Sequence, residues 1–135
     1  MRTTVGLLTV SLVCVPLAAC GGSGGGTSVS DNIGVRRTIG TLTDAARAGD
    51  GKKICNQIFT PLLKKSVTTA AKRPCAVEVK QKLFAKNAQF NVADVAVQGN
   101  QATVRVTDQF HKTSIISLVR ANGAWRISGV TAASS

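Results

Sequence analysis

Residues 118–127 read LVRANGAWRI, and this stretch has the pattern of a β-hairpin. Asn-Gly at 122–123 is the strongest short-range signal for a two-residue type I′ turn, and alternating residues flank it on both sides. The predicted cross-strand pairs are Leu118 with Ile127, Arg120 with Trp125, and Ile116 with Gly129. One face of this hairpin is apolar, and the other carries serines and arginines that indicate partial exposure to water.

A second hairpin is expected just before this one in the chain. Gly99-Asn100 separates two runs in which valine and alanine recur at every second position. The predicted pairs are Val97 with Ala102, Val95 with Val104, and Ala93 with Val106. On the opposite face, Asp94 lies across from Arg105, which predicts an ordinary exposed ion pair.

The preceding half of the chain has helical periodicity. Asp31 or Asn32 can cap a first helix that ends at Gly49-Asp50-Gly51. A second helix is expected over 52–59, a short segment opens at Thr60-Pro61, and a third helix starts at Arg73-Pro74. The apolar stripe of the first helix consists of Val35, Ile39, Leu42 and Ala46. These patterns predict an α+β fold, with three N-terminal helices packed on a curved four-stranded antiparallel sheet.

The N-terminus has the pattern of a bacterial lipoprotein signal. A short basic start precedes an apolar run of about sixteen residues, which is too short to span a bilayer. The run ends in Leu17-Ala18-Ala19-Cys20, which resembles the lipobox at which a diacylglyceryl cysteine becomes the first residue. A Gly/Ser-rich tether follows. We therefore expect a signal peptide at 1–19, lipidated Cys20 and tether at 20–30, and one domain at 31–135, held at the extracytoplasmic side of the bacterial cell membrane. The alternative is ordinary secretory cleavage beside an incidental cysteine.

Two cysteines, Cys55 and Cys75, remain once the leader and the lipidated residue are set aside. An even pair in an exported domain indicates a disulfide, and a loop of this length contributes about 3 kcal/mol to stability. The alternative is a redox-active pair, but the chain lacks the Cys-x-x-Cys spacing typical of one.

The order of three helices and a four-stranded meander, ending in residues 118–127, resembles the nuclear transport factor 2-like superfamily. More narrowly, residues 31–131 are similar to small bacterial envelope lipoproteins of that fold. The resemblance implies a cone-shaped half-barrel, often with a pocket between sheet and helices. It also implies diverse uses, among them isomerases, dehydratases, dimerisation modules and non-catalytic envelope domains, so the fold does not determine the function.

The catalytic members that the chain resembles use Asp, His and Tyr in the pocket. This chain contains no tyrosine, which removes the usual oxyanion donor. The remaining candidates are Asp108, which continues the inward alternation of its strand, and His111, which lies an odd number of residues away and reaches the same face only through a turn. The alternative is that Asp108 ends a strand and His111 lies solvated in a loop.

Positive charge is the most unusual property of the composition. Seventeen Lys and Arg against six Asp and Glu give a net charge of +11, and Arg2 is the only one of these residues in the leader, which leaves +10. A cluster without any acid consists of Lys52, Lys53, Lys64, Lys65, Lys72 and Arg73. It indicates either a solvated face or contact with anionic lipids or wall polymers. Nucleic acid is not expected as a partner, because no aromatic residues alternate with the lysines.

Trp125 is interpreted as a core or cone-mouth residue, with Arg120 stacked on its ring. Taken together, the sequence favours a non-enzymatic module that binds a small apolar ligand or an envelope protein, without a cofactor or metal. The alternatives are an isomerase- or dehydratase-type enzyme using Asp108, or a basic module that docks onto anionic envelope surfaces. A homodimer through the open face of the sheet is a further expectation from the resemblance.

Overall fold

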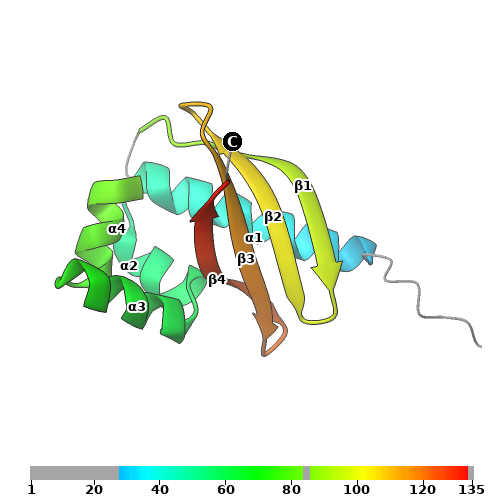
Figure 1. Cartoon of the computed structure of the whole chain (residues 1–135). Coiled ribbons are helices and arrows are strands. Elements are labelled where there is room, and N and C mark those ends of the chain that lie inside the picture. The colour runs from blue at the N-terminus through cyan, green and yellow to red at the C-terminus, as the bar shows by residue number, and fades with distance from the viewer. Residues whose placement is uncertain (1–27, 84–85, 134–135) are drawn as a thin grey trace, which may run out of the picture.

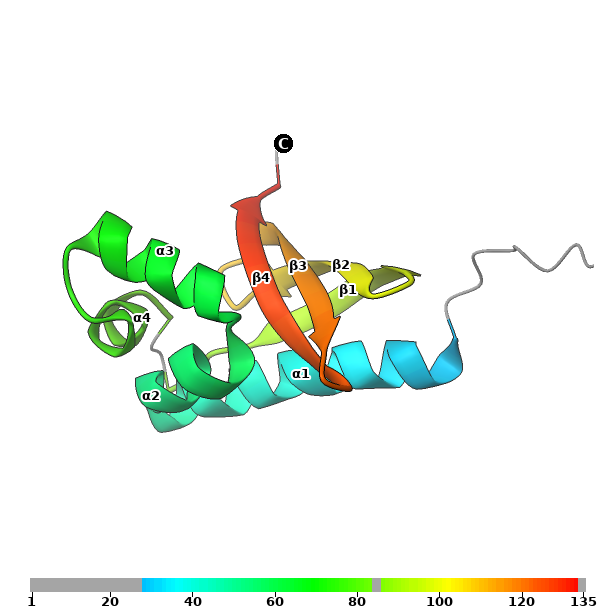
Figure 2. The same ribbon diagram turned by 90° about the horizontal axis from the view of Figure 1, so that it is seen from below.

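The structure is a computed structural model that describes residues 28–83 and 86–133. A helical half precedes a four-stranded sheet in the chain, and the longest helix runs beneath the sheet (Figures 1 and 2). The helical elements are α1 (Val29–Ala48), α2 (Gly51–Lys53), the π-helix η1 (Ile54–Ile58), α3 (Pro61–Ala71) and α4 (Cys75–Leu83). The strands are β1 (Phe90–Gln98), β2 (Gln101–Asp108), β3 (Thr113–Ala121) and β4 (Ala124–Ala132). The predicted α+β class is confirmed.

α1 begins slightly earlier than its sequence pattern indicates. Ser28, rather than Asp31 or Asn32, is the N-cap, because its hydroxyl accepts a hydrogen bond from the Asp31 amide at 3.1 Å. The helix ends as expected at Gly49, whose φ of 86° is readily adopted by glycine. The four predicted stripe residues are all buried, together with Ala45.

α3 is the main departure from the predicted helices. Thr60 caps it and Pro61 starts it, as expected, but the helix continues for 11 residues instead of forming a short segment. Leu63 and Val67, four residues apart, give it an apolar side. The basic connection between the cysteines is therefore a helix, which ends at Lys72 with a φ of 53°.

The four strands pair in sequence order, and each pair is antiparallel. Near both turns the predicted registers are confirmed, because turn chemistry fixes them: Val97 lies opposite Ala102 and Leu118 opposite Ile127. Farther from each turn an irregularity shifts the pairing by one residue. The corrected pairs are Val92 with Val106, in place of Ala93, and Ile116 with Val130, in place of Gly129. Asp94 does lie opposite Arg105, yet the described residues include no ion pair between them.

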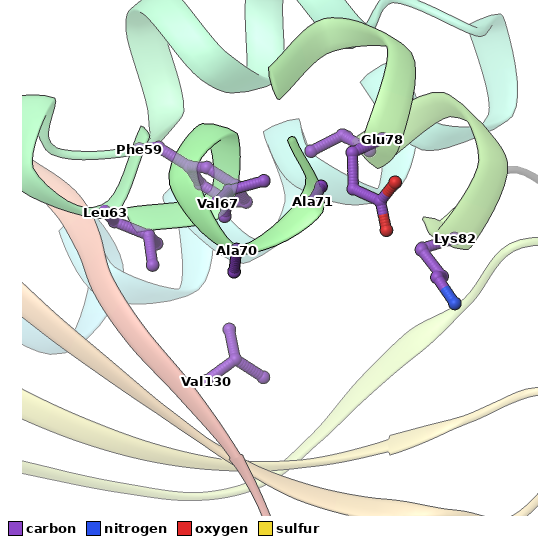
Figure 3. A pocket seen from close by; sticks show the side chains of 9 residues that line it. Phe59, Leu63, Val67, Ala70, Ala71, Glu78, Lys82 and Val130 are labelled. Carbon is purple, nitrogen blue, oxygen red and sulfur yellow. The ribbon is translucent and has the colours of Figure 1, made fainter. Parts of the chain in front are cut away.

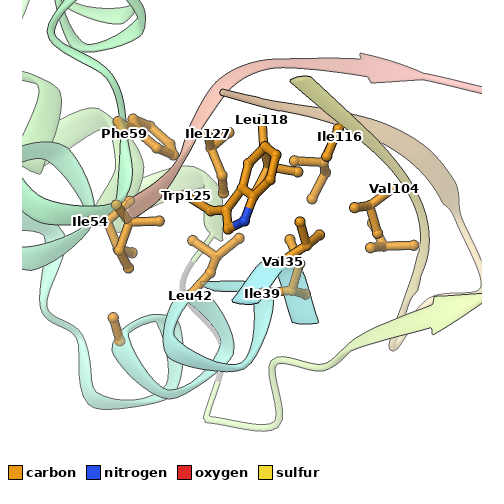
Figure 4. Packing of buried hydrophobic residues seen from close by; sticks show 14 of the residues in the cluster. Val35, Ile39, Leu42, Ile54, Phe59, Val104, Ile116, Leu118, Trp125 and Ile127 are labelled. Atoms are coloured by element: carbon orange, nitrogen blue, oxygen red, sulfur yellow. The ribbon is translucent and has the colours of Figure 1, made fainter. Parts of the chain in front are cut away.

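The hydrophobic core fills the space between α1, η1 and the inner face of the sheet (Figure 4). Its largest fully buried side chains are Ile39, Ile54, Leu118, Ile127, Val35, Val104 and Val106. Each such aliphatic side chain contributes about 1.5–3 kcal/mol by leaving water. The end of η1 is joined to β4, because the Thr60 amide donates to the Ile127 carbonyl at 2.8 Å.

Two close contacts hold α4 against the rest of the helical half. Cys55 in η1 and Cys75 at the start of α4 form the predicted disulfide, with a Cα–Cα distance of 6.2 Å. Gly51 in α2 packs directly on the backbone of α4, where a β-carbon would lie 2.3 Å from the Ala76 carbonyl oxygen. A residue with a side chain at position 51 would therefore push the two helices apart.

Candidate functional site

A groove of about 430 Å³ opens between α3, α4 and β4 (Figure 3). Its apolar lining comes from all three elements and from the residue before the α3 cap: Phe59, Leu63, Val67, Ala70, Ala71, Val79 and Val130. Two charged residues of α4, Glu78 and Lys82, complete the lining. A mostly apolar concavity with a few polar groups is the usual form of a small-molecule site.

The spacing of side chains along α3 explains why the groove exists. Leu63, Val67, Ala70 and Ala71 follow the three- and four-residue helical repeat, so they share the side that faces the sheet. The two alanines are small and leave the middle of the groove open beneath them (Figure 3). α3 buries none of its own residues, in contrast to the closely packed α1.

The opposite wall depends on the irregularity in β4. Val130 pairs with Ile116, which is buried in the core, and directly paired residues share one face of a sheet. With the predicted register, Val130 would have pointed to the outer face. The extra residue of the bulge therefore turns Val130 into the groove, where it remains 55% exposed.

Glu78 and Lys82 lie at the same end of the groove (Figure 3). A Glu78 carboxylate oxygen lies 3.2 Å from Nε of Arg73, which comes from the turn before α4. This ion pair directs the Glu78 charge toward Arg73, so the walls beneath α3 stay apolar. Lys82 is exposed at the groove edge.

The structure brings Asp108 and His111 into one turn between β2 and β3, and neither residue lines the groove. One carboxylate oxygen of Asp108 accepts hydrogen bonds from the amides of Phe110 and Lys112, at 2.8 and 2.9 Å. His111 is exposed with a φ of 60°. These two hydrogen bonds stabilise the turn at the end of β2. The positions of Asp108 and His111 therefore agree with the alternative to a catalytic pair, in which Asp108 ends a strand and His111 lies in a loop.

Arg120 and Trp125 form a link between the sheet and the start of α1. The Arg120 guanidinium lies 5.2 Å from the centroid of the Trp125 ring and forms an ion pair with Asp31. The indole is only 8% exposed and packs so tightly on Gly34 that a β-carbon there would lie 2.8 Å from the ring. Neither Arg120 nor Trp125 lines the groove.

The six predicted basic residues divide between separate surfaces. Lys64, Lys72 and Arg73 surround a hollow of about 600 Å³ over the disulfide, on the other side of α3 from the groove. Lys52 and Lys53 border a neighbouring hollow, which shares Asn56 with the first one. Lys65 lines neither hollow.

The groove residues were not among the candidates from the sequence. The available signal is the four-residue spacing of Leu63 and Val67, although Thr60-Pro61 with Leu62 and Leu63 predicts only a short segment there. The sequence gives no sign that Val130 lines the groove, because the face of the sheet on which its side chain lies depends on the bulge in β4. The lipidation candidate, Cys20, and the leader lie outside the described residues. Within the ranges that the structure describes, no helix is long and apolar enough to cross a membrane.

Comparison with solved structures identifies the fold. The chain is similar to an NTF2-like protein of unknown function from Silicibacter pomeroyi, with 15% identity and a TM-score of 0.55 over 77% of this chain and 96% of that one. It is also similar to the NTF2 protein Rd1NTF2_05 in a form with five substitutions, with 20% identity and a TM-score of 0.51 over 76% and 99% of the two chains. No family model and no curated protein matches the sequence. These likenesses confirm an NTF2-like fold.

Proposed function

We propose that this protein is a lipid-anchored ligand-binding module of the bacterial envelope, and that it binds a small, mostly apolar molecule in the groove between α3, α4 and β4. The observation that carries the proposal is an apolar groove left open at the edge of the filled core, with Phe59 and Val79 at the boundary between the two. The residues under α1 already fill the inner face of the sheet, whereas the space under α3 stays open and apolar. An exposed apolar hollow costs free energy in water, so a ligand that covers it is stabilised by the hydrophobic effect.

The envelope location is supported by two features of the chain. Leu17-Ala18-Ala19-Cys20 and the glycines after it have the pattern of a lipidated cysteine on a flexible tether. The Cys55–Cys75 disulfide fits an oxidising compartment outside the cytoplasm. A module placed there meets apolar molecules at the membrane surface.

Binding of a neutral apolar fluorophore, N-phenyl-1-naphthylamine, tests the proposal. We expect saturable binding by the unlipidated protein, and we expect Ala70→Phe to weaken it about tenfold, which corresponds to 1.4 kcal/mol, because the added ring occupies the middle of the groove. Trp125 fluorescence reports whether each variant keeps its fold, since this buried indole is the only tryptophan.

Thr69→Phe is the matched control, because Thr69 is exposed on the same helix and lines neither the groove nor the basic hollow. It should bind the fluorophore as the wild type does. Absence of saturable binding by the wild type, or equal losses in the two variants, would contradict the proposal.

A further inference from the structure

We propose that the hollow over the Cys55–Cys75 disulfide binds a phosphate group, and that Lys64, Lys72 and Arg73 provide the positive charge. This site lies on the other side of α3 from the apolar groove and takes a different class of ligand. Its lining combines these three cations with Asn56, Thr68 and the first turn of α4. Among the described residues that line it there is no carboxylate.

Two of the cations are already held in position. The Lys64 ammonium donates a hydrogen bond to the Asn56 side-chain oxygen at 2.6 Å, which leaves two of its three N–H groups for a ligand. Arg73 is held by Glu78 and by a hydrogen bond from Nη1 to the Gln81 side chain. Glu78 and Gln81 lie outside the lining of the hollow, so they fix Arg73 without occupying the site, whereas Asn56 is itself part of the lining and holds Lys64 at it.

Lys72 occupies a position that a lysine does not favour. It ends α3 with a φ of 53°, a conformation that costs a residue with a β-carbon more than it costs glycine. Its side chain is exposed, and no hydrogen bond or ion pair of the described residues involves it. Packing therefore does not explain why this position holds a lysine. A role for its positive charge at the rim of the hollow would explain it.

The composition of the hollow favours phosphate over an apolar or cationic ligand. Three positive groups around one concavity raise the local concentration of anions, and a guanidinium with ammonium groups matches the several oxygens of a phosphate. A phosphate group occurs both in soluble phosphates and in the headgroups of anionic lipids. The bound phosphate could therefore belong to either class of molecule.

Titration of the unlipidated protein with inorganic phosphate, followed by backbone amide chemical shifts, tests the site directly. We expect saturable shifts in residues 64–76. Lys64→Gln and Lys72→Gly should each weaken binding about fivefold, the effect of one basic contact. Lys72→Gly should melt at the same temperature as the wild type or higher, because glycine relieves the backbone strain, so a loss of binding in this variant is not a loss of folding.

Lys65→Gln is the matched control, since it removes the same charge from the same helix outside the hollow. It should bind phosphate as the wild type does. If it weakens binding as much as Lys64→Gln does, or if the wild type binds neither phosphate nor vesicles, the proposal is overturned.

Vesicles of phosphatidylglycerol, compared with vesicles of phosphatidylcholine, distinguish the two sources. Selective sedimentation with phosphatidylglycerol, weakened by Lys64→Gln and Lys72→Gly but not by Lys65→Gln, identifies lipid headgroups as the ligand. Shifts with inorganic phosphate and no sedimentation identify a soluble phosphate. Equal sedimentation of all variants, without phosphate shifts, shows only diffuse charge attraction and contradicts the site.

Discussion

α1 and α3 are two helices of one small domain that are packed in opposite ways. α1 buries five residues against the sheet, and α3 buries none. The region around α1 therefore supplies most of the apolar burial that stabilises the fold, while the region around α3 leaves a groove on one side and a basic hollow on the other. The disulfide joins η1 to α4 at the boundary of the two regions, where both cysteines are buried at the edge of the core beneath the basic hollow.

This contrast places the candidate sites where the structure is least constrained by its own core. α3 presents small and half-buried side chains to the groove and lysines to the hollow, so one helix forms a wall of both. Binding regions commonly come from the less stable parts of a domain, because those parts can adjust to a ligand. Substitutions in the two regions should therefore differ in how far they lower the free energy of unfolding.

The largest effect is expected from Leu118→Ala, which removes a side chain that is 1% exposed in the core. It should lower the free energy of unfolding by about 3–5 kcal/mol, through lost burial and a cavity. Val67→Ala in the groove is the comparison and should cost less than about 1 kcal/mol, because the side chain is smaller and only half-buried. Urea denaturation measures both. Equal losses would show that the two regions are packed alike.

A smaller and more local effect is expected from the double variant Cys55→Ala/Cys75→Ala. Loss of the link should lower the free energy of unfolding by about 3 kcal/mol. Because the disulfide joins η1 to α4, amide hydrogen exchange should accelerate first in α3 and α4, while β2 and β3 keep their protection until global unfolding. Uniform acceleration across the sheet and helices would contradict the separation of the regions.

The two regions also differed in how far the sequence predicted them. Pairings next to the turns, such as Arg120 with Trp125, followed from Asn122-Gly123, because a two-residue turn determines the register beside it. The bulges beyond them were missed, since Ala93 and Ser128 carry no local signal for an extra residue. The length of α3 was underestimated because lysines, a serine and threonines interrupt its apolar residues and weaken its apolar stripe.

The groove could not have been predicted from any one segment. It requires α3 to be a full helix and Val130 to face inward, and both depend on packing between distant parts of the chain. The disulfide, by contrast, followed from the number of cysteines and the predicted export of the chain, and the Cys55–Cys75 bond is confirmed. Lipidation of Cys20 and the envelope location stay predictions.

Hydrogen exchange of the α3 amides, measured with and without N-phenyl-1-naphthylamine, tests the division of the molecule most directly. Without the fluorophore, the amides of α3 should exchange much faster than those of β3, because α3 contributes no residue to the buried core. With it, exchange in α3 should slow while β3 stays unchanged. α3 amides as protected as those of β3, with no response to the fluorophore, would show that the groove is part of the rigid core and not a binding site.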